Sequence, residues 1–377
     1  MAIKILHILG SLNRGGVESW LIKSLQKIER NQFALDFLVH STSHGAYEDE
    51  AKALGANIYV CPFPKNPLQF CVGLERILRK QGPYNVVHSH VHYYSGIVLL
   101  TAKNVGIPKR IAHSHSDTRS LSYAASLSRR IYLKLMRYLI NRNATEGLAA
   151  SQEAASALWG ERWMDDGRWR ILHCGIDIRD YMMRPAKDDV RRELGLNPED
   201  IIFGHVGNFV PAKNHEFLLG ILKEAIVINP NVKLLLVGDG SRRVCIEREA
   251  YSLGLTKNIV VLGSRNDVPR ILMGAIDVLL LPSLYEGLPL IILEAQAAGV
   301  PILMSDKVTK EVIVSKSLVN ILSISEHPGA WASMALRRVS DSKWTSEGLL
   351  AISRSDFNLD TSLSALLEIY QGAASLS

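Results

Sequence analysis

The sequence predicts an α/β protein with two doubly wound domains, each built on a mostly parallel sheet. The first observation is length, because 377 residues at roughly 100 to 200 residues per domain favour two domains. The second is the alternation of short β-branched runs with amphipathic segments of helical length, which requires crossover connections onto a parallel sheet. The third is that this alternation starts again after Pro185. With 47% hydrophobic and 21% charged residues, the composition is typical of well-filled cores.

The predicted elements follow in order along the chain. In the first half, strands are expected at residues 3–9, 33–39, 58–61, 86–88, 111–113 and 147–150. In the second half, a charged helix at 188–194 precedes strands at 201–206, 233–237, 259–262, 278–281 and 301–304. Near the end, apolar residues from Leu363 to Tyr370 recur at three- and four-residue intervals, which predicts a helix with one apolar face. We therefore expect Rossmann-like domains at 1–185 and 186–355, facing each other across a cleft, and a terminal segment at 356–377.

Cellular location is predicted from what the chain lacks. No apolar run approaches the roughly 20 residues that a membrane-spanning helix needs. The N-terminus has the pattern of a strand rather than of a signal peptide, so we expect a cytoplasmic protein. The four cysteines show no spacing typical of a zinc site or a disulfide framework, and we expect reduced, structural thiols.

Charge is uneven along the chain. Residues 1–185 carry 24 Lys and Arg against 15 Asp and Glu, and such a surface could attract nucleic acid, anionic lipid or a phosphorylated substrate. Nucleic acid is disfavoured, since no basic motif with interleaved aromatic residues belongs to a known binding module. The segment from Arg129 to Arg142 alternates basic and apolar residues at helical spacing. It is either a solvated helix that covers the core or a helix that lies on an anionic membrane surface, and the charge favours the second interpretation.

Loops that follow strands carry the candidate ligand-binding residues, because doubly wound sheets bind ligands at the carboxyl ends of their strands. Gly15 and Gly16 precede a predicted helix and suit the close approach of a phosphate, although a tight turn without any ligand is equally compatible. In a later loop, Glu286 and Glu294 flank a helix start that contains Gly287 and Pro289. Carboxylates bind vicinal hydroxyl groups and free N–H groups bind phosphate, a combination suited to a nucleotide sugar.

Histidines form a second set of candidates. His88 and His90 follow one predicted strand, and His113 and His115 follow the next. A histidine at a strand end is more often packed or hydrogen-bonded than catalytic, and two histidines within three residues often indicate a metal site. No carboxylate pattern argues for a metal here, so we expect no metal ion, and we expect both histidine pairs to reach the cleft.

These motifs together resemble the retaining family 4 glycosyltransferases of GT-B fold, and within them the bacterial exopolysaccharide type. The resemblance runs in order from residue 3 to about residue 370. It rests on Gly15-Gly16-Val17-Glu18, the two histidine pairs, Ala150-Ser151, Gly175-Ile176-Asp177, Gly207, Lys213-Asn214-His215, Val237-Gly238-Asp239-Gly240, Gly263 to Asp267, and Glu286 with Glu294.

The resemblance implies a role for each matching residue and a final helix that crosses back onto the first domain. Glu294 would bind the ribose. The catalytic residues would be Glu286 on the transferred sugar, Lys213 on the diphosphate, and His115 facing the sugar and the acceptor. The acceptor-side candidates would be His88, His90 and His113. Further donor contacts are implied for Gly15, Gly16, Gly207, Gly238, Arg265, Asn266, Gly287, Leu288, Pro289 and Leu290. The family usually has Arg where this chain has Asn208, so the charge on the diphosphate would depend more on Lys213.

The implied activity is transfer of a hexose from a UDP-sugar, with UDP-glucose favoured, to a saccharide or lipid-linked saccharide. The resemblance further implies retention at the anomeric carbon, polysaccharide assembly as the setting, and no cofactor. Two alternatives remain, a UDP-sugar 2-epimerase of the same shape and a nucleotide-sugar-binding protein that has lost catalysis.

Overall fold

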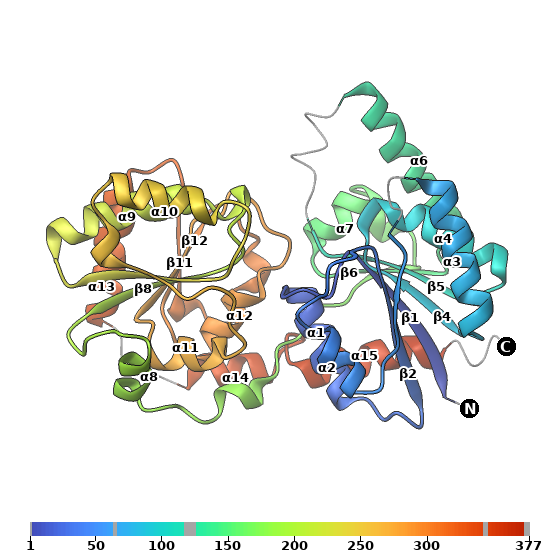
Figure 1. The fold of residues 1–377 in the computed structure, drawn as a ribbon, viewed down its shortest axis with the longest axis horizontal. Helices are drawn as coiled ribbons and strands as arrows, with labels where there is room; N and C mark the ends of the chain where they lie inside the picture. Colours follow the sequence, from blue (N-terminus) through green and yellow to red (C-terminus); the bar gives the residue numbers. More distant parts are fainter. Residues whose placement is uncertain (1, 63–65, 117–125, 342–345, 373–377) are drawn as a thin grey trace. The chain divides into compact units, whose positions relative to one another are not determined.

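The computed structural model describes residues 2–62, 66–116, 126–341 and 346–372. The chain divides into two compact units, the first made of Met1–Gly175 with Leu359–Ser377 and the second of Ile176–Asn358. Each unit is a parallel sheet with helices on both faces (Figure 1). The α/β class and the two doubly wound sheets expected from the sequence are confirmed.

The sheet of the first unit has seven strands in the order β3-β2-β1-β4-β5-β6-β7, all parallel. The strands are β1 Ile3–Leu9, β2 Phe33–Val39, β3 Ile58–Val60, β4 Val86–Ser89, β5 Lys109–Ser114, β6 Glu146–Ala149 and β7 Trp169–Ile171. The central strands are almost entirely buried because helices cover both of their faces. In register, His7 of β1 lies beside His88 of β4.

Among the described residues of the first unit, seven helices surround this sheet. They are α1 Gly16–Lys27, α2 Glu48–Ala53, α3 Pro67–Gln81, α4 Ser95–Val105, α6 Leu127–Asn143, α7 Gln152–Trp159 and α15 Leu359–Gln371. Apolar residues of α3, α4, α6 and α7 share one core, while α1, α2 and α15 lie on the opposite face (Figure 1). The 3-10 turns His92–Tyr94 and Trp163–Asp165 complete the unit.

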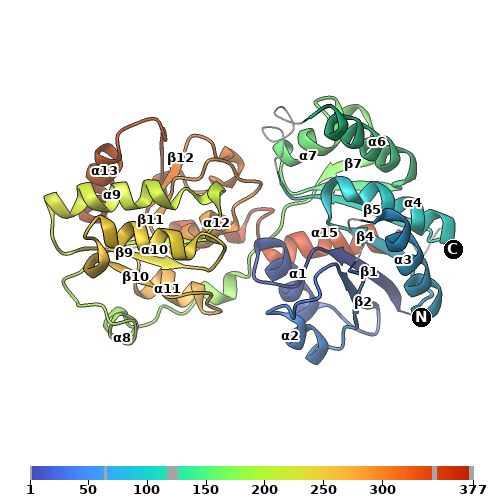
Figure 2. The same ribbon diagram turned by 45° about the horizontal axis from the view of Figure 1, so that its top comes forward.

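The sheet of the second unit has six parallel strands in the order β10-β9-β8-β11-β12-β13. The strands are β8 Ile201–Val206, β9 Val232–Val237, β10 Ile259–Val261, β11 Val278–Leu281, β12 Ile302–Ser305 and β13 Val319–Leu322. The helices are α8 Lys187–Glu193, α9 His215–Ile228, α10 Arg243–Ser252, α11 Val268–Gly274, α12 Leu290–Ala297, α13 Pro328–Asp341 and α14 Glu347–Ser353. Figure 2 shows α9 and α10 side by side over one face, where they share a core with α13.

The boundary between the units lies at Gly175 and Ile176, ten residues before the position expected from the sequence. The reason is local packing: Ile176 donates its N–H to the carbonyl of Phe357, and the 3-10 helix Ile178–Tyr181 packs on α11 and α14. The second boundary, between Asn358 and Leu359, falls three residues after the expected one.

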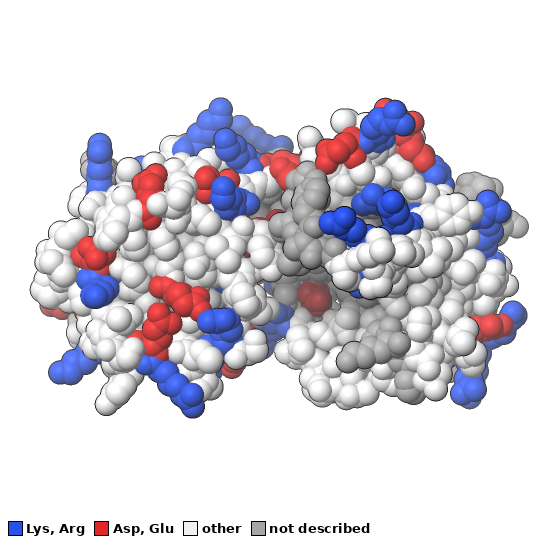
Figure 3. All heavy atoms as spheres, turned by 90° about the horizontal axis from the view of Figure 1, so that it is seen from above, with Lys and Arg blue, Asp and Glu red and all other residues white. Residues whose placement is uncertain are grey.

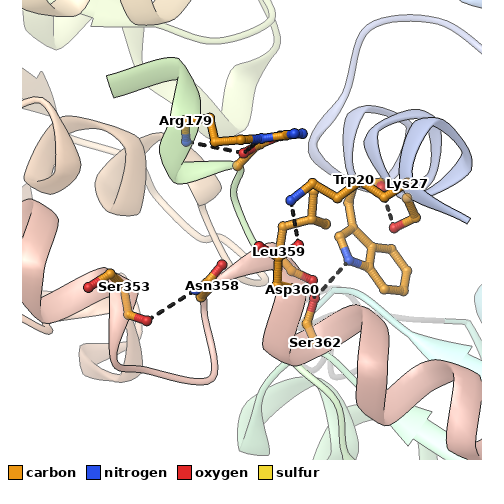
Figure 4. A network of polar contacts seen from close by, with 10 residues as sticks. Trp20, Lys27, Arg179, Ser353, Asn358, Leu359, Asp360 and Ser362 are labelled. Carbon is orange, nitrogen blue, oxygen red and sulfur yellow. Dashed lines mark hydrogen bonds and ion pairs between the residues drawn. The ribbon is translucent and has the colours of Figure 1, made fainter. Parts of the chain in front are cut away.

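The terminal helix α15 belongs to the first unit, as expected for a helix that crosses back. Figure 4 shows its start, where Trp20 Nε1 donates to Ser362 Oγ at 3.2 Å and Lys27 pairs with Asp360. At the other end, the buried Lys109 donates to the carbonyl of Ile369. Within the described residues, no helix is long and apolar enough to cross a membrane.

Candidate functional site

Two glycine-containing loops cross at the carboxyl ends of β8 and β9. The N–H of Gly207 donates to the carbonyl of Val237 at 2.9 Å, and the N–H of Phe209 donates to that of Asp239 at 3.0 Å. Gly238 has φ of +139°, and a Cβ atom there would lie 2.1 Å from the carbonyl oxygen of Gly207. The two loops can therefore approach this closely only because position 238 has no side chain.

Lys213 and Glu286 meet beside these loops. Lys213 ends the 3-10 turn Pro211–Lys213, and its Nζ atom lies 2.6 Å from Oε1 of Glu286, in the loop after β11. Ser283 Oγ donates to the same oxygen at 2.7 Å. The two charged side chains are only 16% and 13% exposed, so each charge has little water around it and depends on its protein partners.

Backbone contacts hold the loops that carry these two side chains. Asn214, directly after Lys213, has a left-handed conformation with φ of +54°, and its Nδ2 donates to the carbonyl of Pro282 at 3.1 Å. The N–H of Leu284 donates to the carbonyl of Ala212 at 2.8 Å. These bonds on either side of Lys213 fix its position relative to Glu286. The sequence analysis did not identify the hydrogen bond from Ser283 to Glu286. The only indication in the sequence was that Ser283 is a short polar residue near the end of a strand.

Glu294 lies further along the same loop-and-helix segment. All residues of α12 are buried except Glu294, which is partly exposed. Burial raises the pKa of Tyr181 well above its usual value, and the nearby Glu294 carboxylate adds to this effect. Gly287, Leu288 and Pro289 connect Glu286 to the start of α12 at Leu290. The structure thus brings together Lys213, Glu286, Glu294 and this connection in one unit.

Arg265 is engaged with a neighbour rather than free to bind a ligand through its side chain. Its Nε and Nη2 atoms each lie 2.8 Å from a carboxylate oxygen of Asp267, and this pairing lowers the pKa of the Asp267 carboxyl. The backbone of Arg265 and Asn266 remains the part that could contact a base. Asn208 is exposed. Arg242 is a cation beside the same loop, since its backbone N–H donates to the carbonyl of Phe209 at 3.0 Å.

In the first unit, Gly15 caps the start of α1 in an extended conformation, with Gly16 as the first helical residue. A Cβ atom at Gly15 would lie 2.3 Å from Oε2 of Glu18. Burial raises the pKa of Glu18 to about 6, although a backbone hydrogen bond acts in the opposite direction. The glycine therefore makes room for the Glu18 carboxyl, and its expected phosphate contact stays a prediction.

The four histidines expected on the acceptor side meet in one cluster of the first unit, joined by His7 and Tyr370. Nitrogen–nitrogen distances are 2.8 Å between His115 Nε2 and His90 Nδ1, 3.0 Å between His90 Nε2 and His7 Nδ1, and 3.1 Å between His88 Nε2 and His113 Nδ1. The Tyr370 hydroxyl lies 2.6 Å from His88 Nδ1 and 3.4 Å from His7 Nε2. His7 was missed because a single histidine inside an apolar strand gives no signal of its own.

Burial determines the protonation of this cluster. It lowers the pKa of His7 and of His115 to about 3, and it lowers the pKa of His88, His90 and His113 well below the usual value. All five imidazoles are therefore neutral at pH 7. An imidazole with so low a pKa is a weak base, and both ring nitrogens of His115 have partners. The acceptor role expected for His115 stays a prediction.

Known proteins match the chain along nearly all of its length. Residues 14–180 match the family described as Glycosyltransferase Family 4, and residues 186–332 match the one described as glycosyl transferases group 1. EpsF of Bacillus subtilis, which is named as a glycosyltransferase, is 31% identical over 97% of this chain and 96% of its own. The chain is a family 4 glycosyltransferase.

More distant relatives agree with this assignment. An Escherichia coli enzyme named UDP-Gal:alpha-D-GlcNAc-diphosphoundecaprenol alpha-1,3-galactosyltransferase is 25% identical over 81% of this glycosyltransferase and 79% of its own chain. The structure of Anabaena HepE in complex with UDP and glucose is similar, with a TM-score of 0.81 and 20% identity over 98% of this chain and 100% of HepE. A sucrose-phosphate synthase of Thermosynechococcus elongatus gives a TM-score of 0.80 at 19% identity, covering both chains fully. These two structures confirm the GT-B fold expected for this glycosyltransferase.

Proposed function

We propose that this glycosyltransferase moves a hexose from a UDP-sugar, with UDP-glucose favoured, to a saccharide or lipid-linked saccharide during polysaccharide assembly. The observation that carries the proposal is the contact between Lys213 and Glu286, with Glu294 on the adjoining helix. A cation for a diphosphate and two carboxylates for sugar hydroxyls are then presented by one unit. The names of the Escherichia coli relative and of the HepE complexes support a uridine donor.

The mechanism follows from the charge that develops on the donor. When the bond between the anomeric carbon and the diphosphate oxygen breaks, its electron pair leaves with UDP, and Lys213 offsets the negative charge that grows there. Glu286 orients the transferred sugar through its hydroxyl groups and keeps the Lys213 ammonium in position. The acceptor oxygen bonds to the anomeric carbon from the side of the leaving group, and its proton passes to the departing phosphate. This order of events retains the anomeric configuration without a covalent enzyme intermediate.

In this proposal the donor reaction needs no bound metal, because Lys213 supplies the positive charge near the diphosphate. Arg242 lies beside the neighbouring loop and pairs with Glu216. Arg242 is then the second cation near the diphosphate, because Asn208, next to Gly207, carries no charge. The proposed donor contacts of Gly207, Gly238, Gly287, Leu288, Pro289 and Leu290 are backbone contacts, which fits their place in loops and at the start of α12.

One experiment tests the proposal against both alternatives. The full-length protein is incubated with a panel of UDP-hexoses, with and without saccharide acceptors, and UDP release and the anomeric configuration of the product are followed by NMR. We expect slow UDP release that an acceptor accelerates, and a product with the donor's configuration. A free UDP-sugar epimer formed without acceptor would identify an epimerase. Binding of UDP-sugars without any turnover across the panel would identify a binding protein.

We also propose that the enzyme contacts an anionic membrane surface through α6. The apolar residues Leu127, Ile131, Leu135 and Tyr138 are 75%, 59%, 50% and 57% exposed, and their spacing places them along one side of the helix. Basic residues border this stripe, and α6 contains no acidic residue. Figure 3 views the molecule from the side on which α6 projects in Figure 1, and both basic and acidic side chains are visible on this face. An apolar stripe between cations suits a lipid-linked acceptor held at a membrane.

A further inference from the structure

The histidine cluster of the first unit brings several imidazole nitrogens close enough together to bind one metal ion. Two sets of three histidines present ring nitrogens that all lie within 4.8 Å of one another, and one of these sets is His90, His113 and His115. His113 is fully buried, and its Nε2 atom has no hydrogen-bond partner among the described residues. The backbone of Leu172 is a hydrogen-bond neighbour of this ring, but the contact lacks the geometry of a full hydrogen bond to Nε2. A buried nitrogen without a full hydrogen bond is costly unless something else binds it.

We propose that His90, His113 and His115 of the first unit form a binding site for a divalent transition-metal ion of the zinc or cobalt class. The ligand atoms follow from the contacts that each ring makes. His113 Nδ1 contacts His88, and His90 Nε2 contacts His7. The other nitrogen of each ring, His113 Nε2 and His90 Nδ1, is therefore left to bind a metal ion. His115 Nε2 faces His90 Nδ1 at 2.8 Å. Three imidazole nitrogens are a donor set that zinc and cobalt prefer.

The remaining ring nitrogens have the partners that metal-binding histidines need. A ligating imidazole usually donates its other N–H to a neighbouring acceptor, which fixes the ring. Here the acceptor is His7 Nδ1 for His90 at 3.0 Å, His88 Nε2 for His113 at 3.1 Å, and Cys174 Sγ for His115 at 3.7 Å.

One set of tautomers gives every imidazole N–H of the cluster an acceptor when the three nitrogens bind a metal. His90, His113 and His115 each keep one proton, on the ring nitrogen that faces away from the metal. His7 and His88 then donate their remaining N–H to the hydroxyl oxygen of Tyr370, which can accept two hydrogen bonds. Every ring is neutral in this arrangement.

For the His90 and His115 nitrogens, metal binding requires only a small opening of the cluster. Two nitrogens bound to one tetrahedral zinc or cobalt ion are about 3.3 Å apart, given metal–nitrogen distances of about 2.0 Å. The present separation of His90 Nδ1 and His115 Nε2 is 2.8 Å. A shift of about half an ångström is within the reach of side-chain rotation, particularly since His90 and His115 are only partly buried. The fourth position of the ion is left for water or another small donor.

The test measures metal binding directly and does not depend on transferase activity. Full-length protein is dialysed against a chelator and titrated with Co²⁺, whose visible absorption reports tetrahedral nitrogen coordination, and with Zn²⁺ in equilibrium dialysis. We expect saturation at one ion per chain and a rise in the melting temperature with Zn²⁺. In H115Q, which alters a partly exposed ring, the affinity should fall by on the order of 100-fold and the Zn²⁺-dependent rise should vanish. H113Q should behave likewise.

The matched control is H327Q, because His327 is an exposed histidine of the second unit. This variant should bind Co²⁺ and Zn²⁺ as the wild type does. Circular dichroism of each variant identifies misfolding, and H115Q decides the question if H113Q does not fold. Absence of saturable Co²⁺ or Zn²⁺ binding to the wild type, or undiminished binding in folded H115Q, would overturn the proposal and leave the cluster as a hydrogen-bonded core.

Discussion

The Nζ atom of Lys213 lies 2.6 Å from Oε1 of Glu286, although 73 residues separate them in the sequence. The pair joins the loop after β8 to the loop after β11, which are neighbouring strands of the second sheet. A nucleotide-sugar diphosphate that reaches this point would share the Lys213 ammonium with Glu286. The cation is then held in place before any reaction begins, and positioning of this kind is what electrostatic stabilisation of a transition state requires.

We predict that Lys213→Ala lowers kcat by roughly 100- to 1000-fold, a range typical of losing one group that stabilises developing charge. The dissociation constant for UDP should change much less, because the charge opposite Lys213 grows only as the donor bond breaks. The control is Lys187→Ala, which removes another lysine of the second unit whose Nζ lies 2.6 Å from a carboxylate, that of Asp277. Steady-state kinetics and UDP calorimetry check the prediction. A proportional loss of UDP affinity and kcat would contradict it.

The two glutamates of the site should bind different parts of the donor, Glu294 the nucleotide and Glu286 the transferred sugar. We predict that Glu294→Ala weakens UDP binding by roughly 1.5 to 3 kcal/mol, since a charged acceptor of ribose hydroxyl groups is lost. Glu286→Ala should leave UDP binding nearly unchanged and impair transfer. Calorimetry with UDP separates the two, with Glu247→Ala on α10 as the control for an exposed glutamate that forms an ion pair. Equal losses of UDP affinity in both site variants would refute the division.

Much of the fold could be predicted because its signals are local. The strand β1 has seven mostly apolar residues, and the predicted bounds 3–9 match the structure. The strands β7 and β13 were missed, since Trp169–Ile171 has only three residues and Val319–Leu322 is not fully buried. The domain boundary was placed too late because the interruption at Pro185 is visible in the sequence, whereas the pairing of Ile176 with Phe357 is not.

The sequence could predict which residues belong to the candidate site, but not which of them contact each other. Glu286 and Lys213 were both expected at the donor, yet the sequence could not show that they pair with each other or that Ser283 supports Glu286. Such contacts depend on which strands are neighbours in the sheet. The same limit applied to His7, which lies beside His88 only because β1 and β4 are adjacent.

The crossing of the two loops at Gly238 gives a prediction for stability. We predict that Gly238→Ala destabilises the second unit by at least about 3 kcal/mol, because strain at positive φ adds to a contact of 2.1 Å with the Gly207 oxygen. The control is Gly254→Ala, where φ is +72° but no atom lies within 4 Å of the new Cβ. That variant should lose only about 1 to 2 kcal/mol. Urea unfolding checks both, and equal midpoints for the two variants would show that the close approach costs nothing.

Glu18 should make stability depend on pH. Burial raises its pKa to about 6 from 4.5, so the folded state binds this proton more tightly than the unfolded chain does. The stabilisation is therefore complete below pH 4.5 and is lost as the pH rises through 6, by about 1 to 2 kcal/mol in total. Glu18→Gln should remove this component of the pH profile, while Glu29→Gln, at an exposed position, should keep it. Urea unfolding between pH 4.5 and 7 measures it, and superimposable profiles for wild type and Glu18→Gln would contradict the assignment.

The last prediction concerns the exposed stripe of α6. We predict that the wild type sediments with vesicles containing anionic phospholipid and much less with zwitterionic ones, since each basic residue near an anionic surface contributes about 1 kcal/mol. The double variant Ile131→Gln with Leu135→Gln removes two apolar side chains that are 59% and 50% exposed, and binding should fall at least about tenfold.

The matched control for α6 is Val227→Gln with Ile228→Gln at the end of α9, where the side chains are 83% and 58% exposed. This pair has comparable chemistry and exposure but lies in the second unit, so vesicle binding should not change. Added salt should weaken binding of the wild type, because it screens the attraction of the basic residues to the lipid. If both double variants lost binding equally, general surface hydrophobicity would explain the association. If the wild type ignored anionic vesicles, α6 would be a solvated helix that covers the core.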